Sequence, residues 1–221
     1  MSINKRQKDV HEFFVKLMEH FENDNRLTAD TFNLLGILNI QLRSTTTCQQ
    51  CLRSNVINEY LWQLSLYFPF AWNEDAASIS ATLDISYLLD IYLKKEVPHD
   101  ACCPQCGVVG RTVKNLNIIN APQVLVLHLS RFNAGFDKID AFVQFSTDFV
   151  TNYITDENGQ QVTYRLTGLI LHTGFSIEEG HYLAYLLIDG NWYEANDKYM
   201  TEVSWQKVRQ LNVYILFYQR L

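Results

Sequence analysis

The sequence lacks any apolar run long enough to cross a membrane. Its longest runs, such as Tyr182 to Ile188, fall far short of the roughly 18 residues that a membrane-spanning helix needs. The first residues, MSINKRQK, are not followed by the apolar segment of a secretory signal peptide. We therefore expect no membrane partner, and an intracellular protein of the cytoplasm, the nucleus or both.

Basic residues are also scarce. The 221 residues include 18 lysines and arginines against 24 aspartates and glutamates, a formal net charge of −6. Proteins that bind nucleic acid cluster lysine and arginine to neutralise phosphates, and no such stripe is present. With 48% hydrophobic residues, the composition indicates a globular chain that does not bind nucleic acid.

Two segments have helical periodicity. From Lys8 to Asp24, apolar residues recur at intervals of three and four, which predicts a helix with one buried face. A second helix fits Ser80 to Lys95, with Ser80 as its N-cap, and ends before Pro98. The buried face of the first helix is expected to contain Val10, Phe13, Phe14, Leu17, Met18 and Phe21.

Most other apolar segments have the period of two that is typical of strands. Two such segments, Leu38 to Leu42 and Tyr60 to Phe68, flank the first pair of cysteines. Helices early in the chain and an antiparallel sheet later predict an α+β fold. After Pro122 the expected strands are residues 124–132, 142–145, 164–171, 182–188, 191–195 and 213–218.

Four of the five cysteines form two C-x-x-C pairs, Cys48 with Cys51 and Cys103 with Cys106. Each spacing lets both thiolates reach one ion, and two pairs complete a tetrahedral zinc site. Four protein ligands leave no open position, so we expect one structural zinc. The alternative is four reduced cysteines packed as small hydrophobic side chains.

Residues near these pairs leave a further choice of ligand. His99 or Cys102 could replace Cys103, but the two-residue spacing favours Cys103. The strand and helix between the pairs are expected to form an insertion between the two zinc-binding turns.

The segment around His181 predicts a pair of polar side chains on one sheet face. Asp189-Gly190 is a strong two-residue hairpin turn. If Ile188 pairs with Asn191, His181 and Asn196 are diagonal neighbours. Asp197 then points the other way unless a bulge intervenes.

A histidine with such a partner has two interpretations. It is typical of the base and orienting group of a nucleophilic triad, or it is structural. The other histidines favour structural roles. His11-Glu12 does not begin a metalloprotease motif, because Val15 stands where the second histidine would be. We expect His20 and His128 to be half-solvated or in the core.

These features together resemble the ubiquitin-specific protease family from about residue 6 to the C-terminus. Residues 7–13, QKDVHEF, are similar to its QQDAHEF helix, and residues 125–132, LVLHLSRF, resemble its LxxHLKRF strand. The cysteine pairs match its zinc-binding fingers. The family's histidine box is matched by His172-Thr173-Gly174, Gly180-His181-Tyr182, Trp192 through Asn196-Asp197, and residues 214–218.

The resemblance implies a papain-like cysteine protease fold of thumb, palm and fingers. Residues 1–36 would be the thumb helix region, 37–118 the zinc-binding fingers and 119–221 the palm sheet with the histidine box. The implied activity is deubiquitination, the hydrolysis of isopeptide and peptide bonds at the C-terminus of ubiquitin. The partner would be ubiquitin or a ubiquitinated protein, with its tail threaded between thumb and palm.

The resemblance also implies roles for individual residues. His181 would be the general base and Asn196 its orienting partner, while Asp197 would help to organise the oxyanion site. Asp9, Phe132 and Tyr182 match positions that line the channel for the ubiquitin tail. Gly180 would allow close approach of the Gly-Gly end of the substrate, where a Cβ would collide.

The sequence departs from the family in two places. Ala195 replaces a usual phenylalanine, and the family's N-terminal cysteine box is missing, because only five residues precede Arg6. None of the five cysteines replaces the nucleophile. We therefore expect this chain alone to be inactive, as a portion of a deubiquitinase whose partner is the missing segment.

Three readings follow from this missing segment. Besides a portion of an active enzyme, the chain could be an inactive ubiquitin-binding or scaffold module, or an unrelated zinc-stabilised β domain. Losing the nucleophile's helix should expose the sheet face that carries His181, Leu183 and Tyr185, which would make the isolated chain marginally stable.

Overall fold

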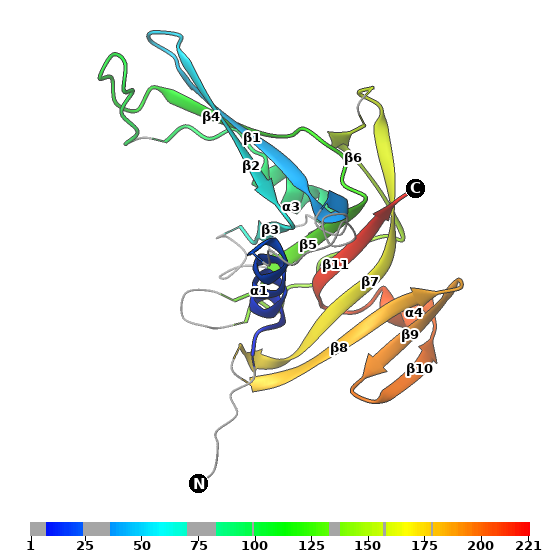
Figure 1. The fold of residues 1–221 in the computed structure, drawn as a ribbon. Helices are drawn as coiled ribbons and strands as arrows, with labels where there is room; N and C mark the ends of the chain where they lie inside the picture. Colours follow the sequence, from blue (N-terminus) through cyan, green and yellow to red (C-terminus); the bar gives the residue numbers. More distant parts are fainter. Residues whose placement is uncertain are drawn as a thin grey trace.

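The computed structural model describes residues 8–23, 36–69, 83–98, 100–132, 138–156, 158–177 and 179–221 (Figure 1). None of the described helices is long and apolar enough to cross a membrane. The elements are α1 (Val10–Asn23), β1 (Ile40–Cys48), β2 (Ser54–Leu61), β3 (Leu64–Tyr67), α3 (Ile85–Tyr92), β4 (Thr112–Ile118), β5 (Val124–Ser130), β6 (Asp148–Thr155), β7 (Gln161–Ser176), β8 (Glu179–Ile188), β9 (Asn191–Asn196), β10 (Tyr199–Val203), α4 (Trp205–Val208) and β11 (Val213–Arg220).

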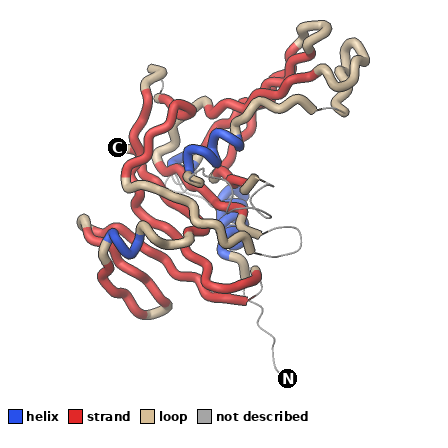
Figure 2. Tube along the Cα trace, turned by 180° about the vertical axis from the view of Figure 1, so that it is seen from behind, coloured by secondary structure: helices blue, strands red, loops and turns tan. Residues whose placement is uncertain are grey.

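Two sheets organise the molecule. A three-stranded sheet has the order β2-β1-β4, and an eight-stranded sheet follows the path β10-β9-β8-β7-β11-β5-β3, with β6 paired to β7. The small sheet projects away from the large one in both ribbon views (Figures 1 and 2). The pairs are antiparallel except β3 with β5. The predicted α+β class is confirmed.

The large sheet is covered on both faces. On one face, Leu127 of β5 belongs to the main core with Leu88 and Leu89 of α3. On the other face, Val126 packs with Met18 of α1 in a second cluster. A strand buried on both sides loses its alternation of apolar and polar residues, which explains why β5 reads as the nearly continuous apolar run VLVLHLS.

Helix α1 begins at Val10, two residues after the predicted start at Lys8, and its apolar face is mostly half-buried. Asp9 caps it, because Oδ1 of Asp9 accepts a hydrogen bond of 2.8 Å from the Glu12 backbone N–H. Met18 is buried, but Phe13 is 61% exposed. The prediction for Phe13 is therefore wrong. Its position, about 100° per residue around the helix, lies at the margin of the stripe formed by Val10, Phe14, Leu17, Met18 and Phe21.

The region assigned to the fingers contains elements that belong to the large sheet. The predicted strand from Tyr60 to Phe68 is broken after Leu61, and β3 pairs parallel with β5. Helix α3 starts after Asp84, whose Oδ1 accepts from Tyr87 N–H at 2.8 Å, whereas Ser80 lies outside the described residues. Thus β3 and α3 are inserted between the zinc-binding turns in the chain, as predicted, but their apolar faces complete the main core.

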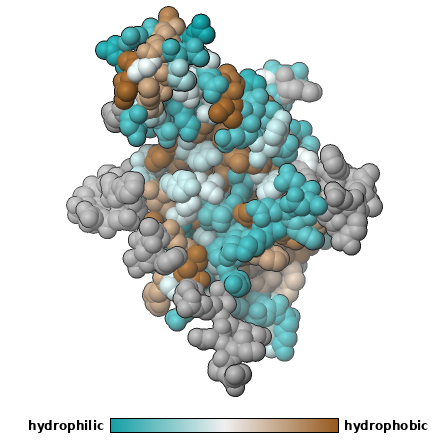
Figure 3. Space-filling view, turned by 60° about the vertical axis from the view of Figure 1, so that its left-hand side comes forward, coloured by the Kyte–Doolittle hydropathy of each residue, from teal (hydrophilic) through white to brown (hydrophobic). Residues whose placement is uncertain are grey.

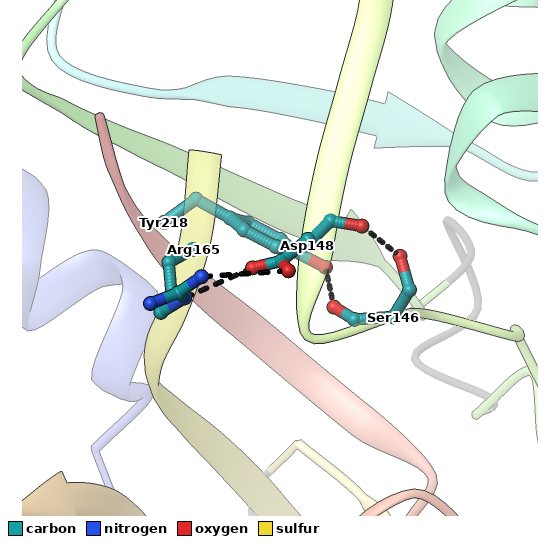
Figure 4. A network of polar contacts seen from close by, with 4 residues as sticks. All are labelled: Ser146, Asp148, Arg165 and Tyr218. Carbon is teal, nitrogen blue, oxygen red and sulfur yellow. Dashed lines mark hydrogen bonds and ion pairs between the residues drawn. The ribbon is translucent and has the colours of Figure 1, made fainter. Parts of the chain in front are cut away.

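Polar contacts attach β6, which the sequence did not predict, to its neighbours (Figure 4). Arg165 Nε of β7 donates to Asp148 Oδ1 at 2.9 Å, and the Tyr218 hydroxyl of β11 donates to the Ser146 carbonyl at 3.0 Å. Ser146 Oγ also donates to the Asp148 carbonyl. The predicted strand at residues 142–145 is instead a loop, apart from a single bridge between Gln144 and Asp84.

The sheet face beneath His181 is better covered than the sequence suggested. Tyr185 is only 1% exposed and Leu183 packs against the main core. Trp192 of β9 and Trp205 of α4, whose ring centroids are 5.8 Å apart, belong to the same core. The expectation of a bare face at Leu183 and Tyr185 is therefore wrong, because both side chains pack into the main core, against which Trp205 of α4 also packs.

Candidate active site and zinc centre

The four paired cysteines form one cluster. Their sulfur atoms all lie within 4.8 Å of one another. Cys48 Sγ is 3.7 Å from Cys106 Sγ, and Cys51 Sγ is 3.8 Å from Cys103 Sγ. A tetrahedral zinc with Zn–S bonds of about 2.3 Å requires sulfur atoms about 3.8 Å apart, so the donor set fits zinc. The prediction of Cys103 as the ligand agrees with this cluster, and His99 lies outside the described residues.

The local backbone favours the thiolate form of two of these cysteines, although burial and neighbouring thiols raise the pKa of Cys106. Hydrogen bonding from the Cys51 backbone N–H lowers the pKa of Cys48 to about 6, and the Cys106 backbone N–H lowers the pKa of Cys103. Zinc binds thiolates rather than thiols. Cys102 is exposed and stays outside the cluster, with its Sγ 3.5 Å from the Gly107 carbonyl oxygen.

The hairpin of β8 and β9 brings His181 and Asn196 together. Ile188 pairs with Asn191, as predicted, and Asp189 and Gly190 have φ angles of 49° and 84° in the turn. His181 Nε2 lies 2.8 Å from Asn196 Oδ1. A carbonyl oxygen only accepts hydrogen bonds, so Nε2 carries a hydrogen. The neutral ring then has its lone pair on Nδ1, which is the tautomer of an oriented general base.

Asp197 also turns toward His181, by a route that the sequence did not predict. Strand β9 ends at Asn196, and Asp197 has a φ of 52° in the turn to β10. The left-handed turn, rather than a β-bulge, brings the Asp197 side chain back toward His181. Asp197 Oδ2 lies 3.9 Å from His181 Nε2. Asn196 is the closer partner, and Asp197 is a more distant charge.

Asp9 connects helix α1 to the strand that carries His181. Its Oδ2 atom accepts hydrogen bonds from the Tyr182 hydroxyl at 3.0 Å and the Tyr214 hydroxyl at 2.8 Å. Burial, reinforced by the charge of Asp9, raises the pKa of both phenols. Sequence reasoning placed Tyr214 in the histidine box without a role. The sequence does contain a signal for this contact. Tyr214 lies in an apolar strand, and a buried tyrosine hydroxyl needs a hydrogen-bond partner.

Phe132 belongs to an aromatic cluster beside these tyrosines. Its ring centroid is 5.6 Å from that of His172 and 5.8 Å from that of Tyr214, both edge to face. The ring of His172 is buried, and neither nitrogen has a hydrogen-bond partner among the described residues. Burial, followed by the charge of Lys138, lowers the pKa of His172. The structure thus brings Asp9, Phe132 and Tyr182 together.

Gly180 is constrained by the chain itself. A Cβ added there would lie 2.4 Å from His172 Nε2 and 2.5 Å from the Thr173 carbonyl oxygen. The family resemblance implied that a glycine is needed at position 180 so that the substrate can approach. The close packing of β7 against β8 is by itself a sufficient reason for a glycine at this position.

Comparison with known proteins identifies the family. Residues 2–218 match the family described as ubiquitin carboxyl-terminal hydrolase. The chain belongs to this family. It is similar to ubiquitin carboxyl-terminal hydrolase 8 of Saccharomyces cerevisiae, with 29% identity over 239 residues that cover 96% of this chain and 49% of the relative. Ubiquitin carboxyl-terminal hydrolase 25 of Arabidopsis thaliana is 29% identical over 231 residues, which cover 97% of this chain and 34% of the relative.

Solved structures agree with this assignment. The SAGA DUB module bound to monoubiquitin matches with a TM-score of 0.78 and 26% identity, over 98% of this chain and 49% of the matched chain. The same module bound to ubiquitin aldehyde matches with a TM-score of 0.76 and 26% identity, over 98% and 50%. The chain therefore has the ubiquitin-specific protease fold, and it spans about half or less of the length of these relatives.

The substitution Gly180→Ala is expected to lower the free energy of unfolding by at least about 2 kcal/mol. The added Cβ would overlap with His172 and the Thr173 carbonyl and force these atoms to move. Gly36→Ala is the matched control, since a Cβ at Gly36 meets nothing within 4 Å. Urea unfolding of both variants measures the difference. Equal stability of Gly180→Ala and the unsubstituted chain would contradict the packing account.

Two stacked histidines join α1 to the large sheet. The rings of His11 and His128 are 3.6 Å apart at 6°, and His128 Nδ1 is 3.1 Å from Ser65 Oγ. His11 also contacts Gln63. Burial, then the charge of His11, lowers the pKa of His128 to about 3, and burial lowers the pKa of His11 despite nearby Asp9.

Stability should fall as the pH drops below about 6.5. Because the folded pKa of His128 lies below the unfolded value, the unfolded chain binds more protons in that window, and stability is lost progressively down to about pH 3. At pH 5 His128 alone should lower the free energy of unfolding by about 2 kcal/mol.

The test compares urea unfolding at pH 7 and pH 5 for the unsubstituted chain, His128→Gln and the exposed control His20→Gln. Zinc sites also weaken in acid, so the difference between variants is the measure. His128→Gln should lose less stability between the two pH values than the other two proteins. Identical losses in all three would rule out the histidine stack as the cause.

Proposed function

We propose that this chain is the histidine-bearing part of the catalytic domain of a thiol-dependent deubiquitinase, which hydrolyses isopeptide and peptide bonds at the C-terminus of ubiquitin. The observation that carries the proposal is the 2.8 Å contact between His181 Nε2 and Asn196 Oδ1, in a chain of the ubiquitin carboxyl-terminal hydrolase family. A domain that only binds ubiquitin needs no oriented base.

In this proposal His181 takes the proton of a cysteine thiol at Nδ1 and later returns a proton to the leaving amine. Asn196 holds the ring through Nε2. Asp197, with Oδ2 at 3.9 Å from Nε2, stabilises the imidazolium that forms during the reaction. The resemblance also implies that Asp197 helps to organise the oxyanion site.

The nucleophile comes from a segment outside these 221 residues. All five cysteines lie in the β1–β2 turn or in the segment before β4, at the end of the small sheet remote from β8 (Figure 1). Four of them have the geometry of zinc ligands, which makes the zinc structural and leaves the reaction to thiol chemistry.

Ubiquitin is the proposed partner. The related SAGA module has been solved with monoubiquitin and with ubiquitin aldehyde. Asp9, Phe132 and Tyr182 lie together, with Tyr182 next to His181 in β8, and are proposed to line the channel for the ubiquitin tail. Gly180 is proposed to border that channel at its catalytic end.

Complementation in trans tests this proposal. The chain is mixed with a cysteine-box segment of a related protease, and hydrolysis of a ubiquitin C-terminal reporter is followed. We expect a rise in melting temperature and hydrolysis that depends on the added cysteine. The chain is an inactive ubiquitin-binding module if it binds ubiquitin and the segment without any hydrolysis.

A further inference from the structure

A cavity of about 330 Å³ lies between the small sheet and helix α3. Its wall is built by β1, β2, β4, β3 and α3, so four strands and a helix fix its shape. These elements are remote from the β8–β9 hairpin in Figure 1. The cavity is therefore separate from the candidate active site, and no step of the proposed reaction uses it.

The inner wall of this cavity is apolar except for one hydroxyl. Leu42 and Leu116 line it, and Ser44 lies two residues from Leu42 on the same face of β1. Ser44 is only 8% exposed. Ser44 lines the cavity, and its hydroxyl can accept a hydrogen bond from an occupant.

The rim of the cavity carries an excess of negative charge. Glu59, Glu96 and Lys114 line it. Lys114 Nζ is 3.8 Å from Glu96 Oε2, and the backbones of these two residues exchange hydrogen bonds of 2.9 and 3.0 Å. Glu59 has no ion-pair partner among the described residues. One carboxylate is thus left over for a cationic occupant.

Two tyrosines complete the cavity. Tyr67 is 63% exposed, and Tyr92 is half-buried. Burial chiefly raises the pKa of Tyr92, and the negative charges of Tyr67 and Glu59 add to the rise. Tyr67, Tyr92 and Glu59 all line this cavity. Aromatic faces beside a carboxylate attract a guanidinium group more strongly than a neutral group.

We propose that this cavity binds an arginine side chain presented by a protein that docks beside the small sheet. The apolar wall accommodates the methylene stem, as amphipathic side chains require. Glu59 and the Ser44 hydroxyl accept hydrogen bonds from the planar head group, which offers five N–H donors. Strand β2 exposes the apolar residues Val56, Ile57 and Tyr60. On the face drawn in Figure 3, hydrophobic patches are interspersed with hydrophilic ones.

The probes are N-acetyl-arginine amide and N-acetyl-citrulline amide, which have nearly the same shape and differ in charge. Binding is followed by chemical-shift changes in the zinc-loaded chain at low salt. The arginine probe should shift resonances of Ser44 and Tyr92 and bind at least about tenfold more tightly than the citrulline probe. At about 1 M salt the difference should shrink, because the rim charges are exposed.

Two substitutions examine the assigned groups. Glu59→Gln and Ser44→Val should each weaken the arginine probe at least about fivefold, while Glu202→Gln, an exposed change on β10, should not. Unchanged melting temperatures establish that the variants are folded. If Ser44→Val unfolds, the arginine affinity of Glu59→Gln alone tests the proposal. Equal binding of arginine and citrulline probes, tighter binding of a lysine probe, or an effect of Glu202→Gln as large as that of Glu59→Gln would each overturn the proposal.

Discussion

Cys48→Ser is expected to abolish zinc binding and to unfold the three-stranded sheet. Strand β2 is exposed along nearly its whole length, so buried apolar surface contributes little to holding it against β1. The cysteine cluster joins the β1–β2 turn, through Cys48 and Cys51, to the turn before β4, through Cys103 and Cys106. The apparent binding free energy of such sites, on the order of 10 kcal/mol, is linked to local folding.

Zinc content and proton–deuterium exchange measure this effect. The unsubstituted chain should hold one equivalent of zinc, and Cys48→Ser should lose it together with the protection of β1, β2 and β4. Strands β5, β7 and β11 should stay protected. Cys102→Ser is the matched control, because Cys102 lies outside the cluster. Less than about a tenth of an equivalent of zinc in the unsubstituted chain would contradict the assignment of the four cysteines as zinc ligands.

His181→Ala is expected to reduce reporter hydrolysis at least about 10³-fold in a protein that contains both this chain and its nucleophile. Removing a general base removes both activation of the thiol and protonation of the leaving group. Stability should change little, because the side chain of His181 is about half-exposed. The exposed His20→Ala is the control and should retain full activity.

The partners of His181 predict a graded series. Asn196→Ala should lower kcat by about 10²-fold or more, because Asn196 fixes the tautomer through a bond of 2.8 Å. Asp197→Asn should have a smaller effect, since its carboxylate is 3.9 Å away and largely exposed. A larger loss for Asp197→Asn than for Asn196→Ala would reverse the assigned roles.

The parts of the structure that depend on local pattern could be predicted from the sequence. Helix α1 follows from its periodicity, and the β8–β9 hairpin from Asp189-Gly190, which also fixed the register that brings Asn196 to His181. The cysteine cluster follows from two spacings. In each case a few neighbouring residues carry the information.

The parts that depend on distant contacts could not be predicted. Parallel pairing of β3 with β5 joins residues 63 positions apart, such as Leu64 and Leu127, and nothing local in the short β3 indicates it. Strand β6 has an exposed side that is rich in polar residues, and β4 contains half-buried polar residues, so neither is a clear apolar segment. The constraint on Gly180 comes from His172 on another strand, and the position of Asp197 from a left-handed turn residue.

The central claim is that this chain supplies the base of a deubiquitinase but not its nucleophile. The most direct test is mass spectrometry after reaction with an electrophilic ubiquitin probe. The account predicts no adduct on the 221-residue chain. It predicts one adduct, on the cysteine of the added segment and dependent on His181, when that segment is present. An adduct on the chain alone, abolished by replacing one of its own five cysteines, would contradict the account.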